Sequence, residues 1–192
     1  MNTSGLIIIA KNAYTQAFLQ DKTEVKKTYK VIASGIIEKD DFFIEIPIGK
    51  VGDDLRRIEL SEENGGKSAK THIKVLERNR EKNITFLEAR LYTGRTHQIR
   101  VHLASLNRHI LGDALYGFKS EKDKIARVML HAYGLYFTHP RTGGQMSFVA
   151  PIRDDFSEIL LSKFSKENID EKIDFMGLSE LFGHCDEWMR II

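Results

Sequence analysis

Leu91–Gly117 reads LYTGRTHQIRVHLASLNRHILGDALYG and marks the point where a strand pattern gives way to a helical one. After Gly94, apolar residues recur at helical intervals, at Ile99, Leu103 and Leu106. We expect Thr96 to cap the start of this helix with its hydroxyl and Asn107 to end it. The segment therefore predicts a strand, a glycine turn and a short helix in succession.

The start of this predicted helix is crowded with side chains that bind anions or aromatic rings. They are Arg95, His97, Gln98, Arg100 and His102. The amides at a helix start attract anions, and a guanidinium matches a phosphate at two points. Any one of these residues alone would be ordinary solvated surface, but together they predict a segment that binds phosphate.

The seven histidines do not have the spacing of a metal site. His97 and His102 are five residues apart, whereas two imidazoles on one helical face are about three or four apart. No neighbouring cysteine or glutamate completes a ligand set. His131 and His139 lie at either end of a predicted strand, where they are expected to pack or cap. The sequence therefore predicts no metal site.

Strand patterns dominate the rest of the chain, on both sides of the opening segment. Apolar and β-branched residues, often alternating with polar ones, indicate strands. The predicted strands are Gly5–Ala10, Lys27–Ala33, Phe42–Ile48, Lys70–Leu76, Ile84–Leu91, Arg127–Thr138 and Gln145–Val149. Helices are expected at Asn12–Gln20 and Asp154–Phe164. The order of elements predicts an α+β fold, with a mixed, mainly antiparallel sheet and flanking helices.

The 192 residues, 42% hydrophobic and 29% charged, have the size and composition of one globular domain. Residues 165–192 carry 3 Lys and Arg against 7 Asp and Glu, which leaves 26 against 20 in residues 1–164. We therefore divide the chain into a basic body, 1–164, and an acidic helical C-terminal appendage, 165–192. A basic body is compatible with an RNA partner, although many proteins without one share this balance.

Apolar runs and cysteine usage bear on the cellular compartment. The longest apolar run, Leu6–Ala10, is far shorter than the roughly 20 residues of a membrane-spanning helix, and nothing before it resembles a signal peptide. The single cysteine, Cys185, cannot form an internal disulfide. The sequence therefore predicts a cytoplasmic protein that does not insert into membranes.

Blocks of sequence spread along the body occur in the order found in a known family. They are Thr3–Asn12 (TSGLIIIAKN), Lys26–Gly35 (KKTYKVIASG), Leu91–His102 (LYTGRTHQIRVH), Ile110–Gly117 (ILGDALYG) and Met129–Gly143 (MLHAYGLYFTHPRTG). In this order they resemble the RluA-type pseudouridine synthases, which isomerise uridine to pseudouridine in ribosomal and transfer RNA. The match extends from Met1 to about Asp155, and the TGRTHQIRVH block is highly specific.

The resemblance implies roles for individual residues. Arg100 matches the family's active-site arginine, which pairs with the catalytic aspartate. Tyr29 matches the tyrosine that lies against the target base and removes the C5 proton. Leu130 matches an apolar position that helps enclose the flipped uracil. Further residues are then expected to bind the RNA substrate: Arg95, His97 and Gln98.

The same resemblance places the nucleophile just before the first residue. In the family, the block that ends in Thr-Ser-Gly begins with His-Arg-Leu-Asp, and this aspartate attacks the substrate without any cofactor. Met1 falls on the position directly after it, so the chain is expected to be truncated and inactive by itself. Asp113, in the Leu-Gly-Asp block, is expected to have a structural role. A misassigned start, an experimentally shortened chain or a genuine loss of the segment would each explain this beginning.

Three functions therefore stay open. The leading one is isomerisation of uridine in ribosomal RNA or tRNA, and the second is that of an inactive RNA-binding fragment or remnant of such an enzyme. A nucleosidase or glycosidase that releases free uracil would share the chemistry at the ribose. A missing segment would also leave Gly5–Ala10 without a partner on one side, which predicts an exposed sheet edge and self-association.

Overall fold

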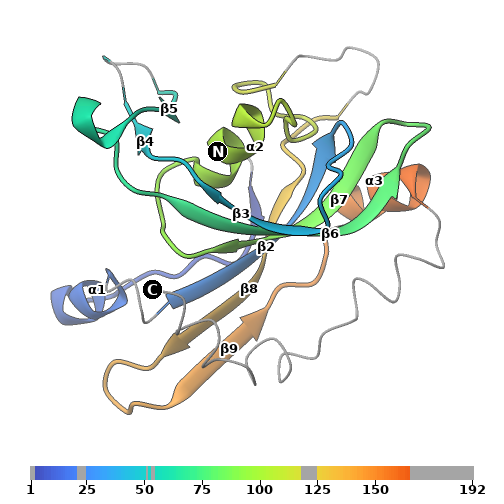
Figure 1. Ribbon diagram of the computed structural model, residues 1–192. Coiled ribbons are helices and arrows are strands. Elements are labelled where there is room, and N and C mark those ends of the chain that lie inside the picture. Colours follow the sequence, from blue (N-terminus) through green and yellow to red (C-terminus); the bar gives the residue numbers. More distant parts are fainter. Residues whose placement is uncertain (1–2, 21–24, 51, 53–54, 118–124, 165–192) are drawn as a thin grey trace.

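The computed structural model describes residues 3–20, 25–50, 52, 55–117 and 125–164. Within them a seven-stranded sheet forms the centre, and a two-stranded sheet lies beside it (Figure 1). The strands are β1 (Ser4–Gly5), β2 (Val25–Ser34), β3 (Asp41–Glu45), β4 (Ile48–Gly49), β5 (Ile58–Glu59), β6 (Lys70–Asn79), β7 (Ile84–Leu91), β8 (Leu130–Thr138) and β9 (Gln145–Val149). The helices are α1 (Ala13–Gln20), α2 (Gln98–Ser105) and α3 (Asp154–Lys163), with a 3₁₀ turn at Glu62–Asn64. The predicted α+β class is confirmed.

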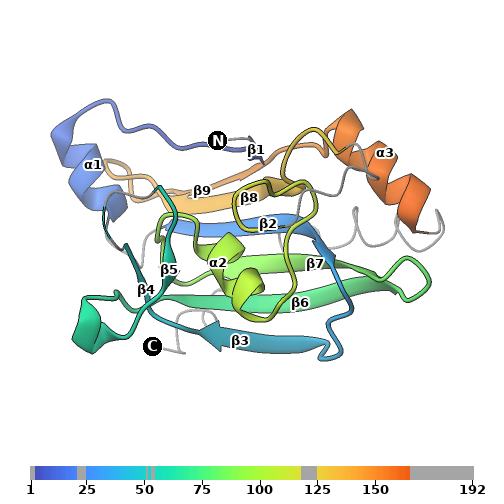
Figure 2. The ribbon, with the colours of Figure 1, turned by 90° about the horizontal axis from the view of Figure 1, so that it is seen from above.

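The large sheet is mixed but mainly antiparallel, as predicted. Its strand order is β1-β8-β2-β7-β6-β3, and β9 pairs with β8 on the same edge as β1 (Figure 2). Among the described strands, β1 and β8 run parallel and the other neighbours run antiparallel. Strand β2 pairs with β7 on one side and with β8 on the other, so its side chains occupy the middle of the sheet.

One face of the sheet carries α2. Tyr29 on β2 pairs with Ala89 on β7, which pairs with Ile73 on β6, and paired residues project to the same face. Thr71 projects to that face too, because it lies two residues before Ile73, and it binds both Gln98 and His102 of α2. Figure 1 shows α2 lying across this side of the sheet.

The opposite face is covered at one end by α3. Phe156 of α3 meets the Phe86 ring of β7 edge-on at 6.5 Å, and Phe164, just after the helix, lies 6.1 Å from the same ring. Phe86 and Phe156 are fully buried. The hydrophobic core therefore lies on both faces of β2 and β7, and this rigid centre positions Tyr29 and α2.

The predicted strand Gly5–Ala10 is wrong beyond its first residue, because strand pairing covers only Ser4 and Gly5. Leu6 still donates its amide to the Ala132 carbonyl at 2.9 Å. Farther on, the chain has no strand partner among the described residues, and Ile7 and Ile9 are 81% and 74% exposed. Apolar, β-branched residues favour a strand only where a neighbouring strand supplies the ladder, which explains the failure.

For α2, the predicted N-terminal cap is wrong and the predicted end of the helix is right. His97, not Thr96, occupies the capping position, with φ of 60° and no capping hydrogen bond from its side chain. Asn107 follows the helix in the left-handed region, at φ of 55°, and donates its amide to the Ala104 carbonyl. Asparagine adopts this conformation more readily than most residues, so its signal was easier to recognise.

The predicted strand Phe42–Ile48 divides into two. Strand β3 ends at Glu45, and Ile48 belongs to β4, which pairs with β5 in the small sheet. Pro47 lies at the break, and it has no amide hydrogen to continue the ladder. The sequence did not predict β5, because a strand of two residues has no measurable periodicity.

The acidic appendage, 165–192, lies outside the described residues, as does Cys185. Its predicted helical structure therefore stays a prediction. In the portion of the chain that is described, no helix has the length and apolar character needed to span a membrane.

Candidate functional site

The loop before α2 is fixed by one buried amide. The Thr93 hydroxyl and the Arg95 amide both donate to Oε1 of Gln98, at 2.7 and 3.0 Å. Its Nε2 donates to the Lys70 carbonyl at 3.0 Å and to the Thr71 hydroxyl at 2.9 Å. Gln98 is 2% exposed. It was predicted to bind substrate, but its hydrogen-bonding capacity is used to hold the loop against β6.

His102 has a similar position one turn farther along α2. Its Nδ1 lies 2.9 Å from the Thr71 hydroxyl and its Nε2 lies 3.0 Å from the Ile46 carbonyl. Burial lowers the pKa of His102, so the ring is neutral near pH 7. The neutral ring donates to Ile46 and accepts from Thr71. His102 therefore anchors the helix to the sheet.

Arg100 forms a two-point ion pair with Asp113. Its Nε donates to Oδ2 at 2.7 Å and its Nη2 donates to Oδ1 at 2.6 Å. The Asp113 side chain is completely buried, and Oδ1 also accepts the amides of Leu115 and Tyr116, both at 3.0 Å. Burial raises the pKa of Asp113, but Arg100 and the two amides outweigh this effect, and the pKa lies below its usual value. The carboxylate holds the turn after α2 together.

Tyr116 extends this cluster towards the small sheet. Its hydroxyl accepts the Arg57 amide at 2.7 Å and lies 3.0 Å from Nδ1 of His97. The Arg100 guanidinium lies 4.7 Å from the centre of the Tyr116 ring, within range of a cation–π contact. Burial and the charge of Arg100 lower the pKa of His97, which favours the neutral imidazole.

A cavity of about 470 Å³ lies between β2, the end of β7 and the loop before α2. We call it the tyrosine cavity. Its lining residues are Ile8, Leu19, Gln20, Val25, Lys27, Tyr29, Leu91, Tyr92, Thr93, Gly94, Arg95 and Thr96. The predicted residues Tyr29 and Arg95 therefore meet there, although 65 positions separate them in sequence.

Lys27 is a lining residue that the sequence reasoning missed. It lies two positions before Tyr29 on β2, and alternation along a strand puts both side chains on one face. Burial raises the pKa of Tyr29 and lowers that of Lys27. Tyr29 thus rests as a neutral phenol beside an amine. The Lys-x-Tyr spacing within a predicted strand was the signal that could have identified Lys27.

Leu130 and Arg100 do not line the tyrosine cavity. Leu130 pairs with Val31 across β2 and β8 and is 5% exposed within the core. In the described ranges no three His, Cys, Asp or Glu side chains gather closely enough to hold an ion. The tyrosine cavity is lined by aromatic, aliphatic, cationic and neutral polar side chains, the last from Gln20, Thr93 and Thr96.

A sequence model of the family described as RNA pseudouridylate synthase matches residues 1–105, which is more than half of the chain. The chain belongs to the RNA pseudouridine synthase family. The predicted resemblance is thereby confirmed at the level of the family. The match includes β2 with Tyr29 and the loop with Arg95, which line the tyrosine cavity, and it includes α2 with Arg100, which does not.

Curated RNA pseudouridine synthases cover most of the chain. The chain is 42% identical over 173 residues to ribosomal large subunit pseudouridine synthase D of Neisseria meningitidis, covering 82% of this chain and 45% of that protein. It is 37% identical over 182 residues to an uncharacterized RNA pseudouridine synthase of Helicobacter pylori, covering 90% of this chain and 55% of that one. The chain thus spans about half the length of these relatives.

Solved pseudouridylate synthase domains have the same fold as this member of the family. The human RNA pseudouridylate synthase domain containing 1 superposes with a TM-score of 0.64 and covers 85% of this chain and 71% of its own. The human domain containing 4 superposes with a TM-score of 0.61, covering 76% and 64% respectively. Their sequences are 24% and 22% identical to this one, so the comparison concerns the fold alone.

Proposed function

We propose that this chain is the larger part of the catalytic unit of a cytoplasmic enzyme that isomerises uridine to pseudouridine in ribosomal RNA or tRNA. The observation that carries the proposal is the tyrosine cavity, in which Tyr29 and Arg95 come together from separate blocks of the family signature. Its volume of about 470 Å³ is within the range of small-molecule sites, roughly 300–1,000 Å³. It is therefore large enough to hold a base that has left its stack.

In this proposal Tyr29 lies against the uracil, loses its phenolic proton to solvent during the reaction, and as the phenolate takes the proton from C5. The reaction breaks the bond between N1 and C1′ and forms one between C5 and C1′, while the C5 proton leaves and N1 gains a proton. Lys27 donates a hydrogen bond to the base, and Leu130 supports the apolar wall from the core. Extrusion of the uridine costs about a few kcal/mol and is least costly in loops and single strands.

The residues around the loop before α2 divide into two roles. Arg95 and His97 bind the RNA backbone, because both are partly exposed. Gln98 acts as a positioning residue that holds the Arg95 amide. Thr93 and Gly94 complete the turn between the cavity and the helix.

We further propose that the nucleophilic aspartate is supplied from outside these 192 residues and docks on Arg100. A guanidinium can bind carboxylates along two edges, and Asp113 occupies the edge formed by Nε and Nη2. Among the described residues Nη1 makes no hydrogen bond, so the second edge can receive another carboxylate. Asp113 itself is a poor nucleophile, because its oxygens are buried and already accept four hydrogen bonds.

Tritium release from RNA labelled at uridine C5 tests the activity. We expect no release by the 192-residue chain, and release once an upstream segment containing His-Arg-Leu-Asp is joined to Met1. In that longer protein, Tyr29→Phe should abolish release while RNA binding is kept. Turnover by the 192-residue chain alone would contradict the external nucleophile.

A longer protein that binds RNA but releases no tritium would instead support the inactive RNA-binding alternative. The genomic DNA provides an independent check, because His-Arg-Leu-Asp should be encoded in frame before Met1. A stop codon there would contradict a misassigned start.

A further inference from the structure

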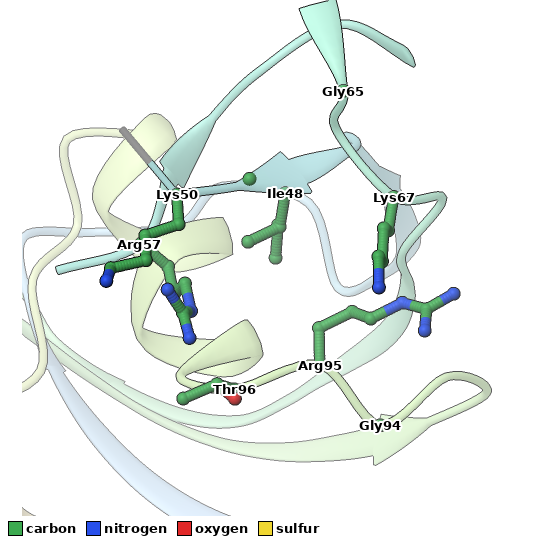
Figure 3. A pocket seen from close by; sticks show the side chains of 9 residues that line it. Ile48, Lys50, Arg57, Gly65, Lys67, Gly94, Arg95 and Thr96 are labelled. Carbon is green, nitrogen blue, oxygen red and sulfur yellow. The ribbon is translucent and has the colours of Figure 1, made fainter. Parts of the chain in front are cut away.

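A second cavity, of about 450 Å³, lies on the other side of the loop before α2. Segments from four parts of the chain line it: Ile48–Lys50, Arg57, Gly65 with Lys67, and Gly94–Thr96. Figure 3 shows Lys50 and Arg57 on one side and Lys67 and Arg95 on the other. We call it the cationic cavity, because these four basic side chains line it and, among the described residues, no acidic side chain does.

Three of the four basic side chains of this cavity are not engaged by acidic groups of the described chain. No carboxylate of the described chain lies within ion-pair distance of Arg57, Lys67 or Arg95. The Arg95 Nε instead donates to a neutral acceptor, the Ser68 carbonyl, at 2.9 Å. Like charges gathered around a hollow repel one another, and an anion placed among them removes this cost.

Two glycines in the wall of the cationic cavity leave open space beside the backbone. An added Cβ at Gly65 or Gly94 would meet no atom within 4 Å, so both glycines border open space rather than packed protein. Arg95 is held from two directions, since its amide donates to Gln98 and its Nε to Ser68. At least one cation is thus fixed in place before any ligand arrives, which reduces the entropy lost on binding.

The two cavities share one wall. Gly94, Arg95 and Thr96 line both the tyrosine cavity and the cationic cavity. A strand of RNA whose base enters the tyrosine cavity therefore brings its neighbouring phosphates to the mouth of the cationic one. Guanidinium and ammonium groups are the usual partners of such phosphates.

We propose that the cationic cavity binds the phosphodiester backbone next to the target nucleotide, and so positions the RNA strand for insertion of its base. This inference rests on the proposed function, but its test measures RNA binding and needs no turnover. The site reads no sequence, because phosphate contacts fix the register of the strand rather than its identity.

Fluorescence anisotropy with a short labelled oligouridylate tests the proposal on the full 192-residue chain. The double variant Arg57→Gln/Lys67→Gln is compared with Lys39→Gln/Lys82→Gln, which removes the same charge. Lys39 and Lys82 are exposed; Lys39 lies in the connection between β2 and β3 and Lys82 in the turn between β6 and β7. Both connections lie at the opposite end of the sheet from β4 and β5 (Figure 1). Thermal unfolding of both variants ensures that equally folded proteins are compared.

We expect the cavity variant to bind the oligouridylate about tenfold more weakly than the control, with a salt slope of log K smaller by about 1.4, or about 0.7 for each lost phosphate contact. Equal affinities and slopes for the two variants would overturn the proposal. As a second readout, titration of the unaltered chain with triuridylate should shift the amide resonances of Gly65 and Gly94. Shifts confined to residues outside the cationic cavity would also overturn it.

The two proposals fail in different ways. Absence of tritium release by the longer enzyme, with the charge-dependent binding intact, would contradict the isomerase and leave the phosphate site standing. Tritium release by the longer enzyme, with equal RNA binding by the two double variants, would support the isomerase and contradict the phosphate site. Binding of inorganic phosphate without binding of triuridylate would contradict an RNA strand as the occupant.

Discussion

Asp113 accepts four hydrogen bonds from Arg100, Leu115 and Tyr116 while its side chain is completely buried. At the scale of single residues this arrangement separates a structural carboxylate from a reactive one. A reactive carboxylate needs a free lone pair facing the substrate, whereas those of Asp113 face the protein. Arg100 is held in place by this partner and can present its other edge to a second group.

We predict that Asp113→Asn lowers the free energy of unfolding by roughly 3 kcal/mol, since it leaves a buried guanidinium without its charge partner. The pKa of Asp113 is lowered in the folded state. Its contribution is therefore complete above the unfolded pKa of about 4 and is lost as the pH falls through the lower folded pKa.

Urea unfolding between pH 6 and pH 3 measures this contribution. The variant should show a flatter pH dependence than the unaltered chain. Glu158→Ala, at an exposed position of α3, serves as control and should change stability by no more than about 0.5 kcal/mol. Parallel pH profiles for Asp113→Asn and the unaltered chain would refute the assignment.

Two glycines of the family blocks predict opposite outcomes when changed to alanine. At Gly112, φ is +72° and an added Cβ would lie 2.0 Å from the Arg127 carbonyl oxygen, so we expect Gly112→Ala to cost at least about 2 kcal/mol of stability. At Gly94 the methyl group meets no protein atom within 4 Å. We expect Gly94→Ala to fold normally and to weaken binding of oligouridylate, because this residue borders both cavities.

Thermal melting and anisotropy on both glycine variants check these expectations. A stable Gly112→Ala protein would show that the close backbone approach is unimportant. Unchanged RNA binding by Gly94→Ala would place the strand elsewhere.

At the scale of elements, the start of α2 depends on a side chain inside the helix. Gln98 accepts hydrogen bonds from the Thr93 hydroxyl and the Arg95 amide and donates two to the start of β6. These bonds fix the loop that both cavities share. The glutamine satisfies a loop amide and not the amides of the first helical turn. The predicted Thr96 cap failed because the helix begins one residue later, so that His97 occupies the capping position.

We predict that Gln98→Leu destabilises the protein by about 2 kcal/mol, because buried polar groups of the loop and of β6 lose their hydrogen-bond partner. It should also weaken oligouridylate binding, since Arg95 loses the bond that holds its amide. Ser105→Ala, at the end of the same helix, is the matched control. Urea unfolding and anisotropy measure the two effects, and a loss of stability without a loss of binding would remove Gln98 from the positioning role.

At the scale of the whole molecule, one edge of the sheet, at β1, continues into an exposed apolar segment. Leu6 makes the last backbone contact with Ala132, and Ile7 and Ile9 then lie largely in solvent. An extended apolar edge of this kind is a site for pairing with another chain. We propose that it drives self-association of the 192-residue protein.

We predict that Ile7→Lys/Ile9→Lys shifts the protein towards the monomer in sedimentation velocity at micromolar concentrations. Leu161→Lys, also at an exposed apolar position, lies on α3 and should leave the association state unchanged. The expected effect comes from charge repulsion along the edge. A monomer before substitution, or an equal shift for Leu161→Lys, would exclude this edge as the contact.

Local pattern determined much of this protein. The strand Gln145–Val149 and the strand Ile84–Leu91 have the bounds that the sequence predicts, because alternation and turn residues act within a few positions. The density of Arg95, His97 and Arg100 also drew attention to the segment whose first residues line both cavities. These signals require only neighbours along the chain.

Other features depended on partners that are distant in sequence. The pairing of Arg100 with Asp113, the inclusion of Lys27 and the cationic cavity each join segments that come together only when the sheet forms. The strand predicted at Gly5–Ala10 failed because a ladder partner is a tertiary property. The sequence by itself therefore determined most of the elements and the family. The tertiary structure decided the short strands and which side chains meet, since both depend on register and packing.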